Sequence, residues 1–378
     1  MTANKKSYYP YFDYLRIVLV SIVMFGHDNL IAWSYSGKLA VDVFFALSGW
    51  LIGSILLRTD ISNLPRFYFN RALRIWVPYY IAFTLIIIAS LLKDPIDLKW
   101  LEFVIYKFTW VYNIFGPPQL QACGGCMPLD GTGNHFWSVN AEEQFYLLAP
   151  LLLVVFASKG RQLITWFLIV ISLWFMDIYA PISLGVFAAI GNSQYPEFHR
   201  NKIIRGLLLL VFIGAAIGLF MTTEYALYSP FFSICLVLLL AIKGKKSVIG
   251  SFLGGISYPL YLNHWIGVFF FNLVLDPFGL RDSGIRQFFS ALMNYGIAAF
   301  LYWFIERRVL AMRDQFYTIN KGIIFMIVAY FSVAIGLIYG VVLNPTIEVG
   351  MFLALFLIVT YLVFASVFRR GVASIREV

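Results

Sequence analysis

Long runs of hydrophobic residues follow one another from residue 14 to residue 368, with short polar segments between them. A helix needs about 20 apolar residues to cross the hydrocarbon core of a bilayer. Runs near this length predict twelve membrane helices, of which the sixth and the eighth are short: 14–33, 40–57, 75–93, 136–157, 162–178, 180–193, 203–221, 230–242, 248–271, 287–306, 321–343 and 350–368. The pattern therefore predicts an all-α fold, a polytopic membrane helix bundle.

The longest break between hydrophobic runs is residues 94–135, which contain Pro117, Pro118 and several glycines. This density of proline and glycine disfavours a long helix and predicts an ordered or mobile cap outside the membrane. The same segment holds Cys123 and Cys126. Without a second pair of cysteines this spacing is a weak metal signal, so we expect a local disulfide or free thiols and no metal site.

Composition agrees with a membrane protein. Hydrophobic residues make up 61% of the 378 residues, charged residues only 12%, and the mean hydropathy is +0.81. A soluble domain carries roughly 25% charged residues. The net charge of +9 could indicate nucleic-acid binding, but the basic residues form short clusters between apolar runs. Such clusters orient membrane proteins, so a nucleic-acid partner is not expected.

The basic residues also predict the orientation of the chain. If the N-terminus is cytoplasmic, 21 of the 28 lysines and arginines fall in inner segments and 6 in outer segments. Positive charge accumulates on the cytoplasmic side of membrane proteins. Twelve helices with both termini cytoplasmic satisfy this rule.

Ionisable residues inside predicted membrane helices are costly and mark functional sites. They are few in this chain: Arg16, His27, Asp42, Glu142, Glu143, His264 and Glu306. The predicted topology places His27, Glu142 and His264 in the outer half of the membrane. It places Arg16 in the inner part, near Arg71 and Arg74 at the start of the third helix.

The separation of the inner arginines from the outer histidines and Glu142 indicates what kind of ligand could bind. Arginines bind phosphate and carboxylate bidentately, and they keep their charge. A histidine beside a carboxylate is a common general base. Arg16 and His27 lie eleven positions apart, roughly 16 Å along a helix. A ligand bound by both ends would need an anionic head and a long arm, as coenzyme A has.

Simpler roles remain open for each residue. Arg71 and Arg74 could be topology anchors, Asp42 could cap the second helix, and His27 could be a packing residue. The 19% of aromatic residues could form interfacial belts. A secondary transporter or flippase for an anionic or sugar-containing solute is the alternative function. Such proteins usually have paired halves, and no such symmetry occurs in this sequence.

Six segments in order resemble the acyltransferase-3 family of integral membrane enzymes, which acylate cell-surface carbohydrates. The first helix has the family's arginine, ten residues and histidine, filled by Arg16 and His27. RALR is similar to its Arg-x-x-Arg motif. The other segments resemble its Asp-Phe-Phe, Trp-Ser, late Ser-Tyr-to-His and closing blocks: VDVFFALSGWLIG (41–53), FWSVNAEEQFYLLAP (136–150), ISYPLYLNH (256–264) and WFIERR (303–308).

The resemblance implies a catalytic membrane domain of about ten helices over residues 1–312, with two additional helices and a cytoplasmic tail over residues 313–378. It implies an acyl-CoA donor, favouring acetyl-CoA, and a hydroxyl acceptor on a cell-surface or lipid-linked carbohydrate. The location implied is a bacterial cytoplasmic (inner) membrane.

The resemblance also implies roles for the matched residues. His27 would be the general base, and Glu142 would support it. Donor binding would fall to Arg16, Arg71 and Arg74. The remaining matched residues would contact substrate, namely Asp42, Trp137, Tyr258 and His264.

Overall fold

Helices joined by turns make up the described part of the computed structural model, residues 8–116, 132–174 and 179–376, with side chains described as far as residue 369. No strand occurs among these residues. The prediction of an all-α fold is therefore confirmed. Cys123 and Cys126, with the two prolines beside them, lie outside the described residues.

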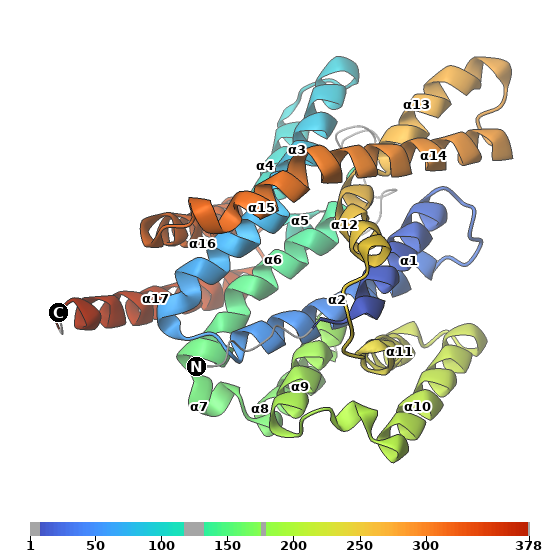
Figure 1. Cartoon of the computed structure of the whole chain (residues 1–378). Helices are drawn as coiled ribbons and strands as arrows, with labels where there is room; N and C mark the ends of the chain where they lie inside the picture. Colours follow the sequence, from blue (N-terminus) through green and yellow to red (C-terminus); the bar gives the residue numbers. More distant parts are fainter. Residues whose placement is uncertain (1–7, 117–131, 175–178, 377–378) are drawn as a thin grey trace. The chain divides into compact units, whose positions relative to one another are not determined.

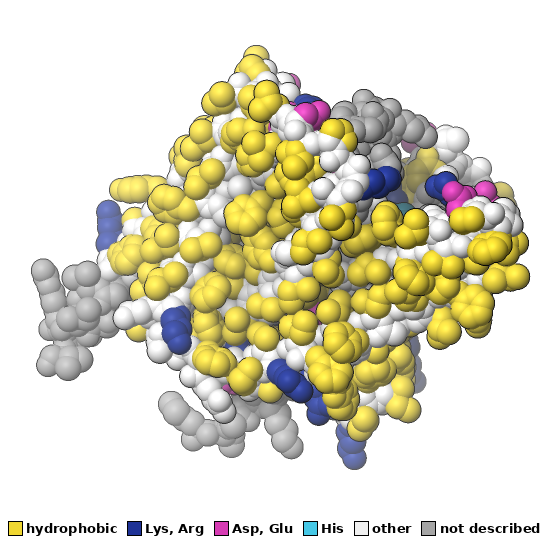
Figure 2. All heavy atoms as spheres, turned by 90° about the horizontal axis from the view of Figure 1, so that it is seen from above, with side chains coloured by type: hydrophobic (Ala, Val, Ile, Leu, Met, Phe, Trp, Pro, Cys, Tyr) yellow, Lys and Arg dark blue, Asp and Glu magenta, His cyan; other side chains and the backbone are white. Residues whose placement is uncertain are grey.

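Within the described residues, six helices are long and apolar enough to cross a membrane, so the polytopic prediction is confirmed: Ser36–Leu56, Ile61–Lys93, Lys202–Met221, Gly284–Phe316, Ile319–Leu343 and Ile347–Arg369. Large apolar side chains on these helices are exposed, among them Ile203, Phe220 and Leu92. Figure 2 shows hydrophobic side chains over most of one face, with few charged ones among them. Lipid would cover such a surface. The count of twelve spanning helices stays a prediction.

The chain divides into two units of contacting helices (Figure 1). The first unit comprises Met1–Leu57 and Arg161–Tyr302. Its helices are α1 (Pro10–His27), α2 (Ser36–Leu56), α8 (Leu163–Trp174), α9 (Ala180–Gln194), η5 (Phe198–Arg200), α10 (Lys202–Met221), α11 (Tyr225–Leu240), α12 (Val248–Asn263), α13 (Trp265–Leu275), η6 (Asp276–Phe278) and α14 (Gly284–Leu301).

The second unit comprises Arg58–Gly160 and Trp303–Val378. Its helices are η1 (Ile61–Asn63), α3 (Leu64–Lys93), α4 (Leu98–Phe108), α5 (Tyr112–Phe115), α6 (Phe136–Pro150), η4 (Leu151–Val155), α7 (Ala157–Gly160), α15 (Arg307–Phe316), α16 (Ile319–Leu343) and α17 (Ile347–Arg376). The π-helix η7 (Tyr302–Glu306) connects α14 to α15.

In the first unit, α1 packs against α12 and α2, and α2 packs closely against α9. Two glycines allow the α2–α9 approach. A Cβ atom on Gly49 would collide with the carbonyl oxygen of Ile182, and one on Gly185 would collide with that of Ala46. Small residues at such positions let membrane helices approach backbone to backbone.

The prediction of a single helix over residues 248–271 is wrong. The structure divides it into α12 and α13, which meet at His264. A break in a helix exposes backbone groups that must find other partners when they are buried. Here Asn294 of α14 supplies them, because its amide oxygen accepts from Gly267 N at 2.8 Å and its Nδ2 donates to His264 O at 2.5 Å.

In the second unit, the predicted helix 75–93 is too short, because α3 begins at Leu64. The polar residues between Arg66 and Arg74 hid this first part from a search for apolar runs. Arg71 and Arg74 therefore lie inside α3 rather than before it. The segment 94–135 contains no long helix in its described residues, as predicted, but it does contain the short helices α4 and α5.

The last two helices belong to the second unit, where α16 packs along α3 and α17 contacts η1 and η4. The predicted helix 136–157 is interrupted at Pro150, after which the chain forms the π-helix η4. Tyr330 of α16 donates its hydroxyl hydrogen to Leu147 O at 2.7 Å, just before this interruption. The helices after residue 312 thus stabilise α6. The domain boundary at residue 312 stays a prediction.

Candidate active site

Two histidines of the first unit are in direct contact. His27 is the last residue of α1, and His264 lies at the break between α12 and α13. His27 Nδ1 is 2.9 Å from His264 Nε2. The side chain of His27 is exposed, whereas His264 is only 4% exposed. The pair therefore combines an accessible imidazole with a buried imidazole behind it, an arrangement suited to general base chemistry.

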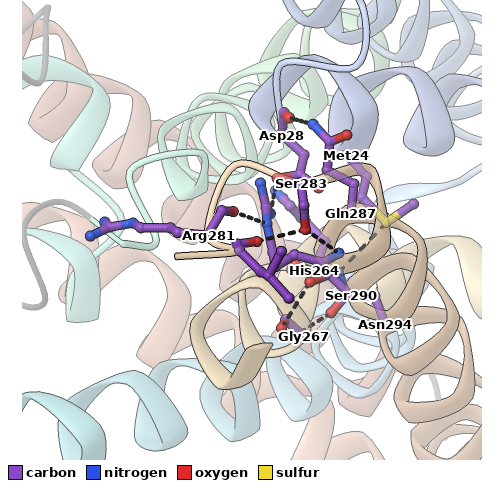
Figure 3. A network of polar contacts seen from close by, with 11 residues as sticks. Met24, Asp28, His264, Gly267, Arg281, Ser283, Gln287, Ser290 and Asn294 are labelled. Carbon is purple, nitrogen blue, oxygen red and sulfur yellow. Dashed lines mark hydrogen bonds and ion pairs between the residues drawn. The ribbon is translucent and has the colours of Figure 1, made fainter. Parts of the chain in front are cut away.

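His264 is fixed by the polar network in Figure 3. Asn294 binds its carbonyl oxygen, as described above, and Ser290 of α14 donates to Gly267 O at 3.1 Å. Both α14 residues are buried. Figure 3 shows these side chains directed from α14 at the backbone on either side of the break. The sequence did not predict this support, because Asn294 and Ser290 match no motif.

The residue after His27 is fixed by the same helix. Asp28 forms a close ion pair with Arg286 of α14, and each side chain is 7% exposed. Arg286 Nε also donates to Arg281 O at 2.8 Å, and Gln287 Nε2 donates to Asp28 O at 3.0 Å. From the sequence, Arg286 is predicted only as a positive charge of an outer segment. The structure instead makes it the buried partner of Asp28, which holds the end of α1 against α14.

The other predicted residues of the first unit have separate partners. Arg16 forms an ion pair with Asp13 at 3.1 Å, one helical turn earlier in α1. Asp42 is buried on α2 and accepts a hydrogen bond from the hydroxyl of Tyr225 at 2.7 Å. Its position inside α2 excludes the alternative role as a helix cap. Asp13 was missed, although its spacing of three from Arg16 is a recognisable ion-pair pattern.

The second unit brings together charged residues of α3 and α6. The Arg71 guanidinium lies 4.9 Å from the ring centre of Tyr146, whose hydroxyl makes a close hydrogen bond to Glu142. Trp76 Nε1 donates to Glu143 Oε2 at 3.1 Å. Arg71 is half-buried. Because its guanidinium is already oriented by Tyr146, the cluster is suited to binding the anionic part of a ligand.

Glu143 is the more deeply buried of the two adjacent glutamates, at 5% exposure, and it was not singled out as a site residue. Sequence spacing cannot separate it from Glu142, because only the rotation of α6 decides which of them faces Trp76. Arg74 is exposed on α3, and Trp137 of α6 and Tyr258 of α12 are half-buried. The ligand contacts of these three residues stay predictions.

Two predicted groupings join residues of different units. His27 belongs to the first unit and Glu142 to the second, so their pairing stays a prediction. The same holds for the cluster of Arg16 with Arg71 and Arg74. Between residues 8 and 376, in the ranges that the structure describes, no group of three His, Cys, Asp or Glu side chains could hold a metal ion.

Lys107, at the end of α4, is buried, although the sequence predicts it in an outer segment. Its side chain is 1% exposed, and its ammonium lies 4.4 Å from the ring centre of Tyr112. Burial lowers the pKa of Lys107 to about 7. Charged lysine is disfavoured in such surroundings, so the proton is lost more readily than in water.

We expect this lysine to make stability depend on pH. Between about pH 7 and its unfolded pKa of about 10.4, the unfolded chain binds more protons than the folded chain. The free energy of unfolding should therefore rise with pH across this window. Lys107→Met should be more stable than the wild type at pH 6, by about 1–3 kcal/mol, and should lose this rise.

Unfolding of the detergent-solubilised protein at about pH 6 to 10 measures the effect. Lys99→Met is the matched control, because Lys99 is an exposed lysine of the same helix, paired with Glu102 at 2.8 Å. Equal pH dependence in the wild type and Lys107→Met would show that Lys107 does not titrate in this range.

The family model described as an acyltransferase domain matches residues 9–305. This match includes both histidines, Arg71 and both glutamates of α6, and it ends before α15. No solved structure matches the chain.

The chain is also similar to curated bacterial proteins. Peptidoglycan O-acetyltransferase OatA of Listeria monocytogenes is 30% identical over 195 residues, 48% of this chain and 30% of that protein. A putative O-acetyltransferase of Staphylococcus aureus strain COL is 28% identical over 225 residues, 56% of this chain and 35% of that protein. Putative peptidoglycan O-acetyltransferase YrhL of Bacillus subtilis is 32% identical over 165 residues, 41% of this chain and 25% of that protein. The matched regions span about a third or less of these relatives' length.

Proposed function

The chain belongs to the acyltransferase-3 family, and from this premise we propose that it transfers an acetyl group from acetyl-CoA to a hydroxyl of a cell-envelope carbohydrate. The names of the relatives support acetyl as the group and peptidoglycan as the acceptor class. Family membership favours this reaction over transport of a solute. The observation that carries the proposal is the exposed His27 in hydrogen-bond contact with the buried His264.

In the proposed reaction His27 removes the proton from the acceptor hydroxyl. The resulting oxygen attacks the thioester carbonyl of acetyl-CoA and forms a C–O bond. The C–S bond then breaks, and the CoA sulfur leaves as a thiolate that takes the proton back from His27. In the alternative route His27 itself attacks the thioester, becomes acetylated and releases CoA. The acceptor hydroxyl then takes the acetyl group from His27.

Arg71 is proposed to bind a phosphate of the donor. Its guanidinium is held over Tyr146 on the second unit, with Glu142 and Glu143 on the facing helix. Guanidinium recognises phosphate bidentately and keeps its charge when partly buried. Arg16 and Arg74 complete the proposed donor site, and Glu142 is proposed to support His27.

The function is tested with the purified full-length chain in liposomes, supplied with acetyl-CoA labelled in the acetyl group and with soluble peptidoglycan fragments. We expect release of free CoA and transfer of the label to the fragments as a base-labile ester. Absence of both binding and turnover of acetyl-CoA by folded protein would reject the donor. CoA release without labelled fragments would reject the acceptor.

Arg71→Ala should raise the donor KM by about 10–100-fold, with a smaller effect on kcat at saturating donor, because a charge-assisted hydrogen bond is lost. Arg71→Lys should recover only part of the loss, since lysine cannot bind phosphate bidentately. Arg66→Ala is the matched control, because Arg66 is an exposed arginine of the same helix that pairs with Asp314. A donor KM equal in Arg71→Ala and Arg66→Ala would make Arg71 a topology anchor.

A further inference from the structure

We propose that His264 is a positioning residue that fixes the tautomer of His27 and stabilises its protonated form during the reaction. This inference rests on the proposed function, in which His27 is the base. It gives His264 a role other than the substrate contact that the family resemblance implies. The residues involved all belong to the first unit.

The tautomer follows from the hydrogen bonds of His264. Its Nδ1 lies 2.8 Å from Tyr261 O. A carbonyl oxygen only accepts, so Nδ1 of His264 carries a hydrogen. In a neutral imidazole the other nitrogen then has a lone pair, so His264 Nε2 is an acceptor. The group 2.9 Å away, His27 Nδ1, must therefore be the donor. A neutral His27 with its hydrogen on Nδ1 has its lone pair on Nε2, which is the atom that would take the proton from the acceptor hydroxyl.

The orientation of the two rings supports a hydrogen bond. The ring centres of His27 and His264 are 5.1 Å apart, and the ring planes differ by 25°. This separation is close to the N–N distance plus the two ring radii, so the rings meet edge to edge. In that arrangement the hydrogen on His27 Nδ1 points along the lone pair of His264 Nε2, as a linear hydrogen bond requires.

One helix fixes both partners. Asn294 of α14 binds the carbonyl of His264 and also approaches Met24 Sδ at 3.7 Å, one turn before His27 in α1. Arg286 of the same helix holds Asp28, the residue after His27. Figure 3 shows Asn294 directed toward Met24 of α1 and toward the break at His264, and Gln287 directed toward Asp28. A base whose tautomer and position are fixed before the reaction needs no rearrangement during it.

The charged groups on the packed elements have partners of their own. On α14 the guanidinium of Arg286 is paired with Asp28. On α2 and α11, Asp42 accepts from the Tyr225 hydroxyl and Lys38 lies 4.6 Å from the Tyr225 ring. On α12 the other titratable side chains are the phenols of Tyr258 and Tyr261. On α14 the Tyr295 hydroxyl lies 2.5 Å from Ser21 Oγ, and on α1 Arg16 is paired with Asp13. His264 is in direct contact with His27 and is therefore placed to respond when His27 gains a proton. The imidazolium of His27 keeps its Nδ1 hydrogen bond to His264 Nε2, which stabilises the added charge.

Two substitutions at one position test the proposal. His264→Gln introduces an amide oxygen that can lie near the place of Nε2, whereas His264→Leu presents no acceptor. We expect His264→Leu to lower kcat by about 10²-fold with little change in donor KM, which is the lower end of the effect of removing a general base. The acid limb of its pH–rate profile should move to lower pH by about one unit, because the protonated base has lost its acceptor. His264→Gln should recover most of the rate and the wild-type midpoint.

The matched control is His199→Gln on η5, since His199 is also buried and its Nε2 lies 2.9 Å from Ala241 O. This variant should leave the midpoint unchanged. Equal rates and midpoints for His264→Leu and His264→Gln would overturn the proposal. Wild-type protein without acetyl-CoA turnover would instead overturn the proposed function, so the two failures are distinguishable.

A second measurement needs no turnover. Solid-state ¹⁵N NMR of the liposome-embedded chain, labelled at its four histidines, reports which ring nitrogens carry hydrogen. His27→Gln and His264→Gln assign the two signals. We expect Nδ1–H for both residues at neutral pH. An Nε2–H tautomer of His27 would overturn the proposal even if every variant were inactive.

Discussion

His27→Ala should lower acetyl transfer by about 10²–10⁴-fold at unchanged protein abundance, the range expected when a general base is removed. The exposed side chain of His27 at the end of α1 has its Nδ1 2.9 Å from His264 Nε2, so the proposed base contacts the residue proposed to orient it. The loss should fall on kcat, because His27 is not proposed to bind the donor.

The assay compares label transfer from acetyl-CoA by wild type and His27→Ala in liposomes, together with binding of acetyl-CoA at equilibrium. Retained binding with lost transfer is the expected result. His199→Ala controls for removal of a buried histidine elsewhere in the first unit. Wild-type turnover by a folded His27→Ala sample would exclude His27 both as a base and as an acetylated intermediate.

Arg286→Met should destabilise the protein by about 3–5 kcal/mol, because it leaves the carboxylate of Asp28 buried without its partner. Both side chains are 7% exposed, so water cannot replace the lost ion pair. Methionine keeps much of the length of arginine, so the effect reports the charge rather than a large cavity. Adding Asp28→Asn to the variant should recover a large part of the loss, since the unpaired charge is then removed.

Thermal and denaturant unfolding in detergent measure this difference. Arg281→Met is the control, because the side chain of Arg281 is exposed and its backbone oxygen, which the substitution keeps, is what accepts from Arg286. If Arg286→Met and Arg281→Met were equally stable, the Asp28–Arg286 pair would contribute nothing to holding α1 against α14. Arg286→Met should also lower turnover, since Asp28, the residue after His27, would lose its ion pair with α14.

Several features of this protein could be predicted from the sequence. Runs of apolar residues predicted an all-α membrane protein, because each backbone group in lipid must be satisfied within its own helix. The ionisable residues in those runs made His27, His264 and Asp42 candidate site residues, since the cost of placing such groups there is high. Motif spacing made Arg71 a further candidate and indicated the family. The match of the family model over residues 9–305 confirmed the family.

Tertiary structure decided what surrounds each of these residues. The break at His264 could not be predicted from 248–271, because the polar groups that stabilise it come from Asn294 on another helix. Glu143 could not be distinguished from Glu142, since the choice depends on which side of α6 faces Trp76. The early start of α3 was hidden because polar residues, both exposed and half-buried, interrupt its apolar pattern.

The same reason explains why the burial of Arg286 and Lys107 could not be predicted from the sequence. Each was counted as a charge outside the membrane, and each is buried in the structure, one against Asp28 and the other over the ring of Tyr112. Hydropathy is a property of a residue and its neighbours along the chain, so it predicts which segments leave water. The partner of a buried charge can lie far away in sequence, as Asp28 does from Arg286, and only the packing of helices brings it into place.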